Sequence, residues 1–209
     1  MDWMIWTWMR SNDRRGHLAP EIPAVSTTLE AVDALLAVDV GNTRIGLAVW
    51  DDDGLHAARR LGREPPQRWR DALGELWAQT AGAKRRTIVI SSVAPRRARE
   101  FADCALDVCG VEPLFVRDDV PLPMPTRLDN EKQVGADRIC AAAAAYERIQ
   151  SACAVASFGT AITIDCVSRD GVFLGGTILP GLQTACDALQ AHTERLPRVQ
   201  AARRSRGRR

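Results

Sequence analysis

The segment 35–49 constrains the fold of this chain more than any other part of the sequence. It reads as two apolar β-strands, residues 35–38 and 45–49, joined by a short polar turn that contains Gly41 and Thr43. Glycine tolerates backbone angles that other residues resist, so the pattern predicts a β-hairpin. Backbone N–H groups in such a turn can point together and bind phosphate oxygens. An ordinary surface hairpin is the alternative, and it is favoured on this segment alone.

Three further glycine-containing segments favour phosphate binding over an ordinary surface hairpin. Residues 134–138 place an acid and a base beside a glycine, just before an alanine-rich segment. Residues 157–163 repeat the strand, Gly-Thr turn and strand of the first hairpin, and residues 175–181 form another glycine-lined turn. Two hairpins so far apart in sequence could bind the phosphates of one nucleotide from both sides. Asp39, at the end of the first strand, would repel bare phosphate and is better suited to hydrated Mg²⁺.

The spacing of apolar residues predicts an α/β protein. One helix is expected over residues 65–81, because Trp69, Leu73, Leu76 and Trp77 share a face. The other expected helices are 95–109, 136–149 and 181–192, and the expected strands after the first hairpin are 54–60, 87–90, 113–116, 152–156, 161–167 and 172–178. The first part of the chain therefore has the order β-β-β-α-β-α-β, and the three later strands restart the pattern.

Taken together, these motifs resemble one known family. The matching segments are residues 39–46 (DVGNTRIG), 91–95 (SSVAP), 134–138 (VGADR), 158–163 (FGTAIT), 175–181 (GGTILPG) and 192–197 (HTERLP). In these segments, and over about residues 34–199, the chain resembles the type III pantothenate kinases, which belong to the actin-like, sugar-kinase-like ATPase superfamily. The resemblance implies an actin-like (ribonuclease H-like) two-lobe kinase fold with an incomplete second lobe. The expected parts are a poorly ordered extension (1–33), a first lobe (34–120), a partial second lobe (121–199) and an arginine-rich tail (200–209).

The activity implied by this resemblance is ATP-dependent phosphorylation of pantothenate to 4′-phosphopantothenate, the first step of coenzyme A biosynthesis. ATP and phosphate binding are assigned to Asp39, Val40, Gly41, Asn42, Thr43, Arg44, Ile45, Gly46 and Thr160. Substrate binding is assigned to Leu128, Gly135, Ala136, Asp137 and Arg138. The cofactor would be Mg²⁺ with ATP, held through water by Asp39.

Asp137 is the candidate catalytic base, and Arg138 is suited to bind the planar pantothenate carboxylate. The alternative is structural: Asp137 would be a charge in the first turn of a helix, where the helix dipole favours it. The residues alone leave these two interpretations about even, and the resemblance favours the catalytic one. His192 is expected to be a helix-end or packing residue.

Three departures from the family pattern affect the expected chemistry. Ser157 stands where many members carry an aspartate that helps to hold a monovalent cation, so K⁺ or NH₄⁺ dependence is in doubt. Leu128 stands where the family often has a substrate-contacting tyrosine. The third departure is the missing C-terminal part of the second lobe, which in the family closes the nucleotide pocket.

The composition limits which other classes of protein this chain could belong to. The chain has 209 residues and a net charge of +2, which implies affinity for neither nucleic acid nor membrane. No apolar segment reaches the ~18 residues of a membrane span. The six cysteines form no C-x-x-C pair and are expected to be reduced core residues of a cytoplasmic protein.

Two features leave alternatives open. The tryptophan-rich segment 1–10 could bind a membrane surface or a partner, but an extension outside the fold is favoured. The early end of the family pattern favours a second function class: a catalytically inactive, truncated homologue that acts as a binding or regulatory protein, or a broken-gene fragment. The resemblance also implies a homodimer.

Overall fold

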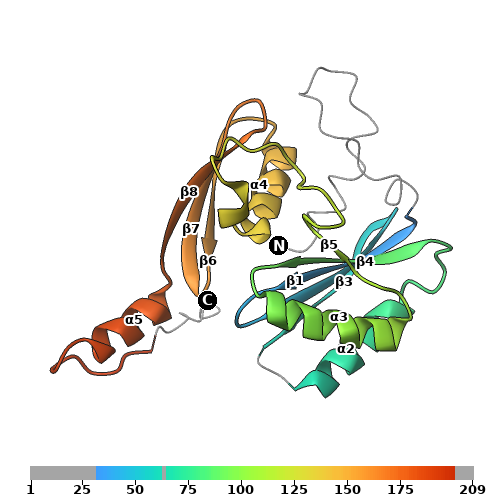
Figure 1. Cartoon of the computed structure of the whole chain (residues 1–209), viewed down its shortest axis with the longest axis horizontal. Coiled ribbons are helices and arrows are strands. Elements are labelled where there is room, and N and C mark those ends of the chain that lie inside the picture. The colour runs from blue at the N-terminus through green and yellow to red at the C-terminus, as the bar shows by residue number, and fades with distance from the viewer. Residues whose placement is uncertain (1–31, 63–64, 201–209) are drawn as a thin grey trace, which may run out of the picture.

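Two β-sheets and the helix between them form the framework of the molecule (Figure 1). The computed structural model describes residues 32–62 and 65–200. The strands are β1 (Ala34–Val40), β2 (Ile45–Asp51), β3 (Gly54–Leu61), β4 (Arg86–Ser92), β5 (Leu114–Phe115), β6 (Cys153–Phe158), β7 (Ala161–Val167) and β8 (Phe173–Pro180). The helices are α2 (Pro66–Ala78), α3 (Pro95–Cys109), α4 (Ala136–Ile149) and α5 (Leu182–Ala191), with the 3₁₀ turn η1 (Glu131–Gln133) before α4.

The first sheet has the strand order β3-β2-β1-β4-β5. β1 pairs antiparallel with β2 through the predicted hairpin and parallel with β4, so that Asp39 lies between Gly46 and Ser91. Because β1 and β4 are parallel, their carboxyl ends meet at one edge of the sheet. The β1–β2 turn and the Ser91-Ser92 segment therefore share that edge.

Helices α2 and α3 cover one face of this sheet (Figure 1). The face of α2 predicted from the sequence is the one that packs inward, since Trp69, Leu73, Leu76 and Trp77 are all buried. The Trp69 ring contacts Phe101 of α3 with the ring centroids 5.7 Å apart. α3 begins with Pro95 in its first turn and ends at Gly110, whose φ of 68° gives the left-handed helix cap that glycine favours.

Helix α4 lies between the two sheets. Its residues Ala136, Cys140, Ala141 and Ala144 pack against the first sheet, whereas Ile139, Ala142 and Ala143 pack with Val167 and Phe173 of the second. Residues 139–144 of α4 are all buried, as expected of a helix segment that is apolar all round. The alanine-rich composition of α4 follows from this position, because small side chains let two sheets approach one helix.

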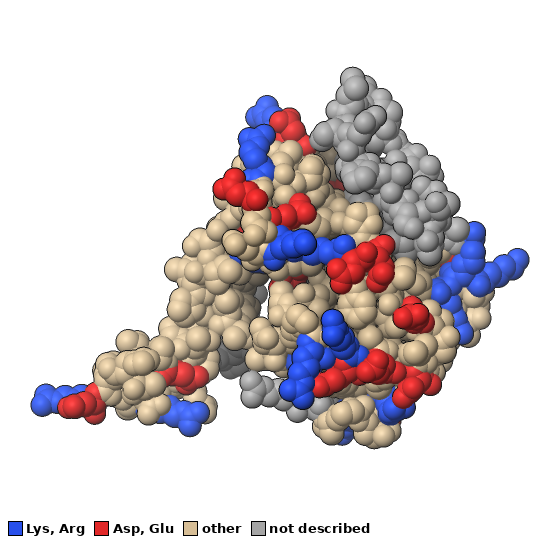
Figure 2. Space-filling view, in the orientation of Figure 1, with Lys and Arg blue, Asp and Glu red and all other residues tan. Residues whose placement is uncertain are grey.

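The second sheet is an antiparallel meander in the order β6-β7-β8, and α5 extends from its end, away from the rest of the molecule (Figure 1). Several large apolar side chains of this part face solvent: Phe158, Ile164, Leu174, Ile178, Leu179, Leu182 and Leu189. Figure 2 shows few charged side chains on this arm between its two ends.

The element order predicted from the sequence is confirmed over the described residues, including the order β-β-β-α-β-α-β of the first part. One prediction is wrong in part. All six cysteines are free, but only Cys104 and Cys140 are buried, and Cys166 is exposed because it faces outward from β7. The tryptophan-rich segment and the arginine-rich tail lie outside the described residues, apart from residue 200. No helix in the described ranges is long and apolar enough to span a membrane.

Candidate active site

The β1–β2 turn forms one wall of the candidate site. The Gly41 N–H donates to the Arg44 carbonyl at 2.9 Å, which closes the turn tightly. A Cβ on Gly41 would lie only 3.3 Å from that carbonyl oxygen, so the close approach favours glycine. Asp39 is half-buried at the end of β1, and Thr43 is half-buried in the turn.

Arg97 of α3 donates hydrogen bonds that fix the position of this turn. Its Nη1 donates to the Gly41 carbonyl at 3.0 Å, and its Nη2 donates to the Gly62 carbonyl at 2.8 Å. Its guanidinium also lies 5.6 Å from the centroid of the Trp69 ring. With its carbonyl bound to Arg97, the Gly41 peptide has a fixed orientation. Sequence reasoning gave Arg97 no role.

The β6–β7 turn reaches the β1–β2 turn from the second sheet. Thr43 Oγ1 and Thr160 Oγ1 lie 3.2 Å apart, within hydrogen-bonding distance, although 117 positions separate them in sequence. The structure therefore brings together the two Gly/Thr turns that the sequence marked as a phosphate-binding pair.

The amino end of α5 packs on the β6–β7 turn. The Thr160 carbonyl accepts from the Gly181 N–H at 2.9 Å and from Thr184 Oγ1 at 2.8 Å. A Cβ on Gly181 would overlap the Gly159 carbonyl oxygen and lie 2.5 Å from that of Thr160. Only glycine at position 181 allows this approach without a shift of the backbone.

The start of α4 presents Asp137. Gly135 lies so close to this side chain that a Cβ would overlap Asp137 Oδ1 and lie 2.7 Å from Val93 Cγ1. Burial raises the pKa of Asp137, and the charge of Asp165 raises it further, while the Arg138 N–H and the Arg138 charge oppose the increase. A carboxylate with a raised pKa is a better proton acceptor than an exposed one.

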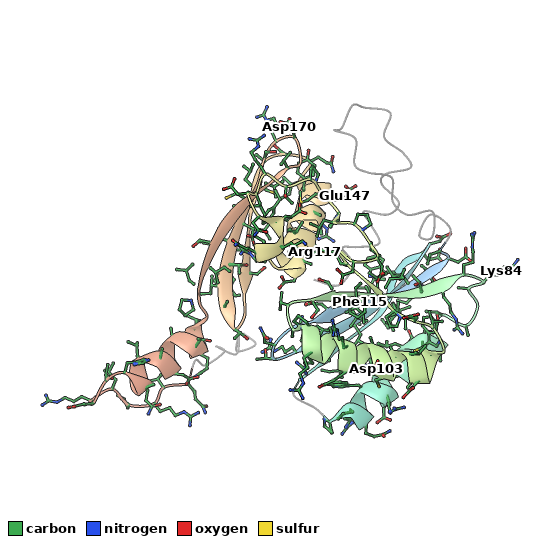
Figure 3. The ribbon with its side chains drawn as sticks, viewed as in Figure 1. Lys84, Asp103, Phe115, Arg117, Glu147 and Asp170 are labelled. Atoms are coloured by element: carbon green, nitrogen blue, oxygen red, sulfur yellow. The ribbon has the colours of Figure 1, made fainter. Side chains whose placement is uncertain are left out.

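The buried thiol of Cys140 is influenced by both candidate carboxylates, Asp39 and Asp137. Burial raises the pKa of Cys140 to about 12, and the charges of Asp137 and Asp39 both add to this increase. Arg117 acts on the same thiol in the opposite direction. Arg117 lies beside α4 (Figure 3), and its Nη2 donates to the Val134 carbonyl. The charges of Asp39 and Asp137, from β1 and α4, thus both act on one thiol.

Arg138 forms a buried ion pair with Asp165 of β7. Its Nε lies 3.0 and 3.2 Å from the two carboxylate oxygens, and its Nη2 lies 2.5 Å from Oδ1. The side chains of Arg138 and Asp165 are 10% and 2% exposed. Sequence reasoning gave Asp165 no role. One feature of the sequence could have identified it: an acidic residue within a strand of β-branched residues. A carboxylate that is buried in such a strand requires a partner.

The remaining predicted residues lie at the margins of this arrangement. Leu128 packs partly buried against the α4–β8 cluster and contacts β8 at Gly175. Ser157 is half-buried on β6, opposite Thr163 of β7. The described residues contain no group of three or more His, Cys, Asp or Glu side chains that could hold a metal ion.

Comparison with known proteins places these features in a family. A family model described as "Type III pantothenate kinase" matches residues 35–208. A type III pantothenate kinase from Desulfatibacillum aliphaticivorans is 40% identical over 173 residues, which are 79% of this chain and 66% of that protein. The corresponding protein of Geobacter sulfurreducens is 37% identical over 177 residues, covering 82% of this chain and 69% of that protein. The chain thus spans about two thirds of the length of these relatives.

Among solved structures, a Ppx/GppA phosphatase from Aquifex aeolicus aligns with a TM-score of 0.46 and 14% identity, covering 76% of this chain and 54% of that one. The ethanolamine utilization protein EutJ from Carboxydothermus hydrogenoformans aligns with a TM-score of 0.42 and 15% identity, covering 79% and 58%. These scores are too low to support an argument. The sequence match and the observed element order confirm the expected α/β, actin-like fold.

Proposed function

Since this chain belongs to the type III pantothenate kinase family, we propose that it transfers the γ-phosphoryl group of ATP to the primary hydroxyl of pantothenate. The product would be 4′-phosphopantothenate. The observation that carries the proposal is the contact between Thr43 and Thr160, which joins the two candidate phosphate-binding turns. Phosphoryl transfer depends mainly on such positioning and on charge stabilisation.

The β1–β2 turn would bind the ATP phosphates through its backbone N–H groups, with Arg97 fixing the Gly41 peptide from the opposite side. The Thr160 hydroxyl would contribute from the β6–β7 turn. The Thr160 carbonyl is already bound to Gly181 and Thr184, so α5 holds this turn in place. The two turns would thus contact the phosphates from opposite lobes.

Asp137 would act as the general base. The pantothenate hydroxyl oxygen forms a bond to the γ-phosphorus while the bond from that phosphorus to the β–γ bridging oxygen breaks and ADP leaves. The hydroxyl proton passes to the Asp137 carboxylate, whose pKa burial has raised. A base of this kind typically contributes ~10²–10⁴-fold in rate.

Arg138 would bind the pantothenate carboxylate beside this base. Its Nε and Nη2 atoms already bond to Asp165, so the substrate carboxylate would have to approach the Nη1 side of the guanidinium. Guanidinium is suited to this because it presents several donors in one plane. The pantothenate site would then contain one cation with a defined orientation.

Mg²⁺ would arrive with ATP, and the residues present fit it. Mg²⁺ keeps several waters and needs only one or two carboxylates besides the phosphates, and Asp39 supplies one beside the turn. Bound there, Mg²⁺ would offset negative charge on the phosphates. The monovalent-cation position is a poorer fit, because Ser157 offers a neutral hydroxyl where a carboxylate would bind more strongly.

The test is a direct kinase assay on the full chain with ATP, Mg²⁺ and either pantothenate or pantothenol, its alcohol analogue that keeps the hydroxyl and lacks the carboxylate. We expect ³¹P NMR to show 4′-phosphopantothenate from pantothenate, and a higher KM for pantothenol. Calorimetry with ATP and with pantothenate measures binding independently of turnover. Binding of ATP and pantothenate without any product would favour the inactive homologue.

A further inference from the structure

The buried ion pair between α4 and β7 has a consequence for the catalytic base. Three hydrogen bonds join Arg138 to both oxygens of Asp165, at 2.5 to 3.2 Å. Such a bidentate, charge-assisted contact fixes the plane of the guanidinium as well as its position. Because both side chains are almost fully buried, neither can exchange its partner for water.

The second sheet holds Asp165 rigidly. Asp165 lies in the middle of β7, paired with Val155 of β6 and Gly176 of β8. A Cβ on Gly176 would lie 2.6 Å from Asp165 Oδ1 and would overlap the Ile164 carbonyl oxygen. The absence of a side chain at position 176 therefore leaves the space that the Asp165 carboxylate occupies.

Two carboxylates bond to Arg138, one to its backbone N–H and the other to its guanidinium. Asp137 precedes Arg138 in the chain, and Asp137 Oδ1 accepts the Arg138 backbone N–H at 2.8 Å. The guanidinium of Arg138 nevertheless bonds to Asp165. Asp137 is half-buried, so a direct ion pair with Arg138 would be favourable if Asp165 did not already hold the guanidinium.

We propose that Asp165 is a positioning residue that holds the Arg138 guanidinium away from Asp137, so that the Asp137 carboxylate remains able to accept the hydroxyl proton of the substrate. The role of the proton acceptor rests on the proposed function, whereas the competition between the two carboxylates rests on the contacts alone. A carboxylate that is paired with a guanidinium is a weaker base.

The charged groups that influence Asp137 come from α4 and β7. Arg138 follows it on α4, and Asp165 faces it from β7. One turn further along α4, Cys140 is influenced by Asp137, by Asp39 of β1 and by Arg117. Removal of the charge at position 165 alters this balance in two ways, since it removes one anion and releases one cation.

The test measures the titration of the Asp137 carboxyl by ¹³C NMR in the full chain, without substrate. In Asp165→Asn we expect the pKa of Asp137 to be lower by about 1 or more, because the Asp165 charge is lost and Arg138 turns toward Asp137. The matched control is Asp170→Asn, an exposed acidic residue in the β7–β8 turn (Figure 3), which should leave the titration unchanged. An unchanged pKa of Asp137 in Asp165→Asn would overturn the proposal.

The double variant Asp165→Asn, Arg138→Gln tests whether Arg138 causes the lower pKa, and it also covers poor folding of the single variant, because it leaves no unpaired buried charge. We expect the pKa of Asp137 to return to the wild-type value or above it. A pKa that stays low in the double variant would show that Arg138 is not the cause and would overturn the proposal. With an active wild type, the acid limb of the kcat profile should move to lower pH in Asp165→Asn. An inactive wild type with the expected titrations would contradict the proposed kinase function and leave the positioning role supported.

Discussion

At the scale of single residues, burial makes the Asp137 carboxylate a stronger proton acceptor. The same carboxyl group on an exposed helix start would have an ordinary pKa and would be favoured there only by the helix dipole. Here Gly135 and Val93 enclose it, and the loss of water raises its pKa. The raised pKa links catalysis to stability, and each of these can be tested with the same substitution.

Asp137→Asn keeps the shape of the side chain and removes its ability to accept a proton. We expect kcat to fall by roughly 10²–10⁴-fold, while calorimetry shows ATP and pantothenate binding within about twofold of wild type. Glu131→Gln on the exposed 3₁₀ turn is the matched control and should leave kcat unchanged. Normal turnover in Asp137→Asn would return this residue to the role of a helix-start charge.

The pH dependence of stability provides a second test of Asp137. Its pKa is raised in the folded protein, so the folded state binds the proton more tightly than the unfolded state. Its stabilising contribution is therefore fully present below the unfolded pKa and is lost as pH rises through the folded pKa. We expect Asp137→Asn to raise Tm at neutral pH and to leave Tm nearly unchanged near pH 3. A variant that is less stable than wild type at neutral pH would contradict the burial argument.

The sequence identified Asp137 and Arg138 but not Asp165. Asp137 and Arg138 are adjacent and lie in a recognisable motif, so local pattern was sufficient. Asp165 is 27 positions from Arg138, and only the packing of β7 on α4 brings the two together. Arg97 was not predicted for the same reason. Its partner Gly41 is 56 positions away, so no local pattern indicates the contact.

At the scale of secondary-structure elements, the two candidate phosphate turns owe their positions to helices behind them. α3 supplies Arg97 to the β1–β2 turn, and the start of α5 supplies Gly181 and Thr184 to the β6–β7 turn. In both cases a donor binds a turn carbonyl, which fixes a peptide plane. Turn geometry of this kind depends on contacts outside the turn, which is why the turn sequence alone did not distinguish a phosphate site from a surface hairpin.

Removal of Arg97 should weaken nucleotide binding more than it weakens the fold. In Arg97→Ala the Gly41 peptide loses its bound donor, so we expect the KM for ATP to rise about tenfold, with the KM for pantothenate within about twofold. Arg96→Ala is the matched control, because Arg96 is exposed and pairs only with Glu100 on the same helix. Equal effects of the two variants on the KM for ATP would argue against a role for Arg97 in the turn.

Substitution of Gly181 should displace α5 from the β6–β7 turn. The Cβ of Gly181→Ala would overlap a backbone carbonyl, so we expect a lower Tm and faster amide exchange in residues 182–191. Gly82→Ala is the control, since a Cβ at position 82 meets nothing within 4 Å. The proposed contact would be contradicted by a Gly181→Ala variant with the wild-type Tm and exchange pattern.

Element boundaries were the most predictable part of the fold. Helices 95–109 and 136–149 match α3 and α4, and Gly110 marks the end of the first of them. The location of α4 was not predictable in the same way. The predicted boundary at residues 120 and 121 assigns it to the second lobe, whereas the structure shows α4 in contact with both sheets. Its run of alanines was visible in the sequence, but alanine fits an exposed helix equally well.

At the scale of the whole molecule, the arm formed by β6–β8 and α5 exposes an unusual amount of apolar surface. Phe158 is 76% exposed, Leu182 66% and Ile178 61%. We expect a second copy of the chain to cover part of this surface, so that sedimentation shows concentration-dependent association. Phe158→Ser with Leu182→Ser should reduce association, whereas Leu106→Ser, at an exposed position of α3, should not. A chain that stays monomeric at high concentration would contradict this expectation.

The position of α4 also bears on how the molecule unfolds. The first sheet has a cluster of its own under α2 and α3, but on its other face it shares α4 with the second sheet, because α4 contributes side chains to a cluster against each sheet. Detachment of either sheet would expose alanine and isoleucine side chains of α4 and weaken the packing of the other. The two halves should therefore melt in a single cooperative transition, with the amides of α4 among the last to exchange with solvent.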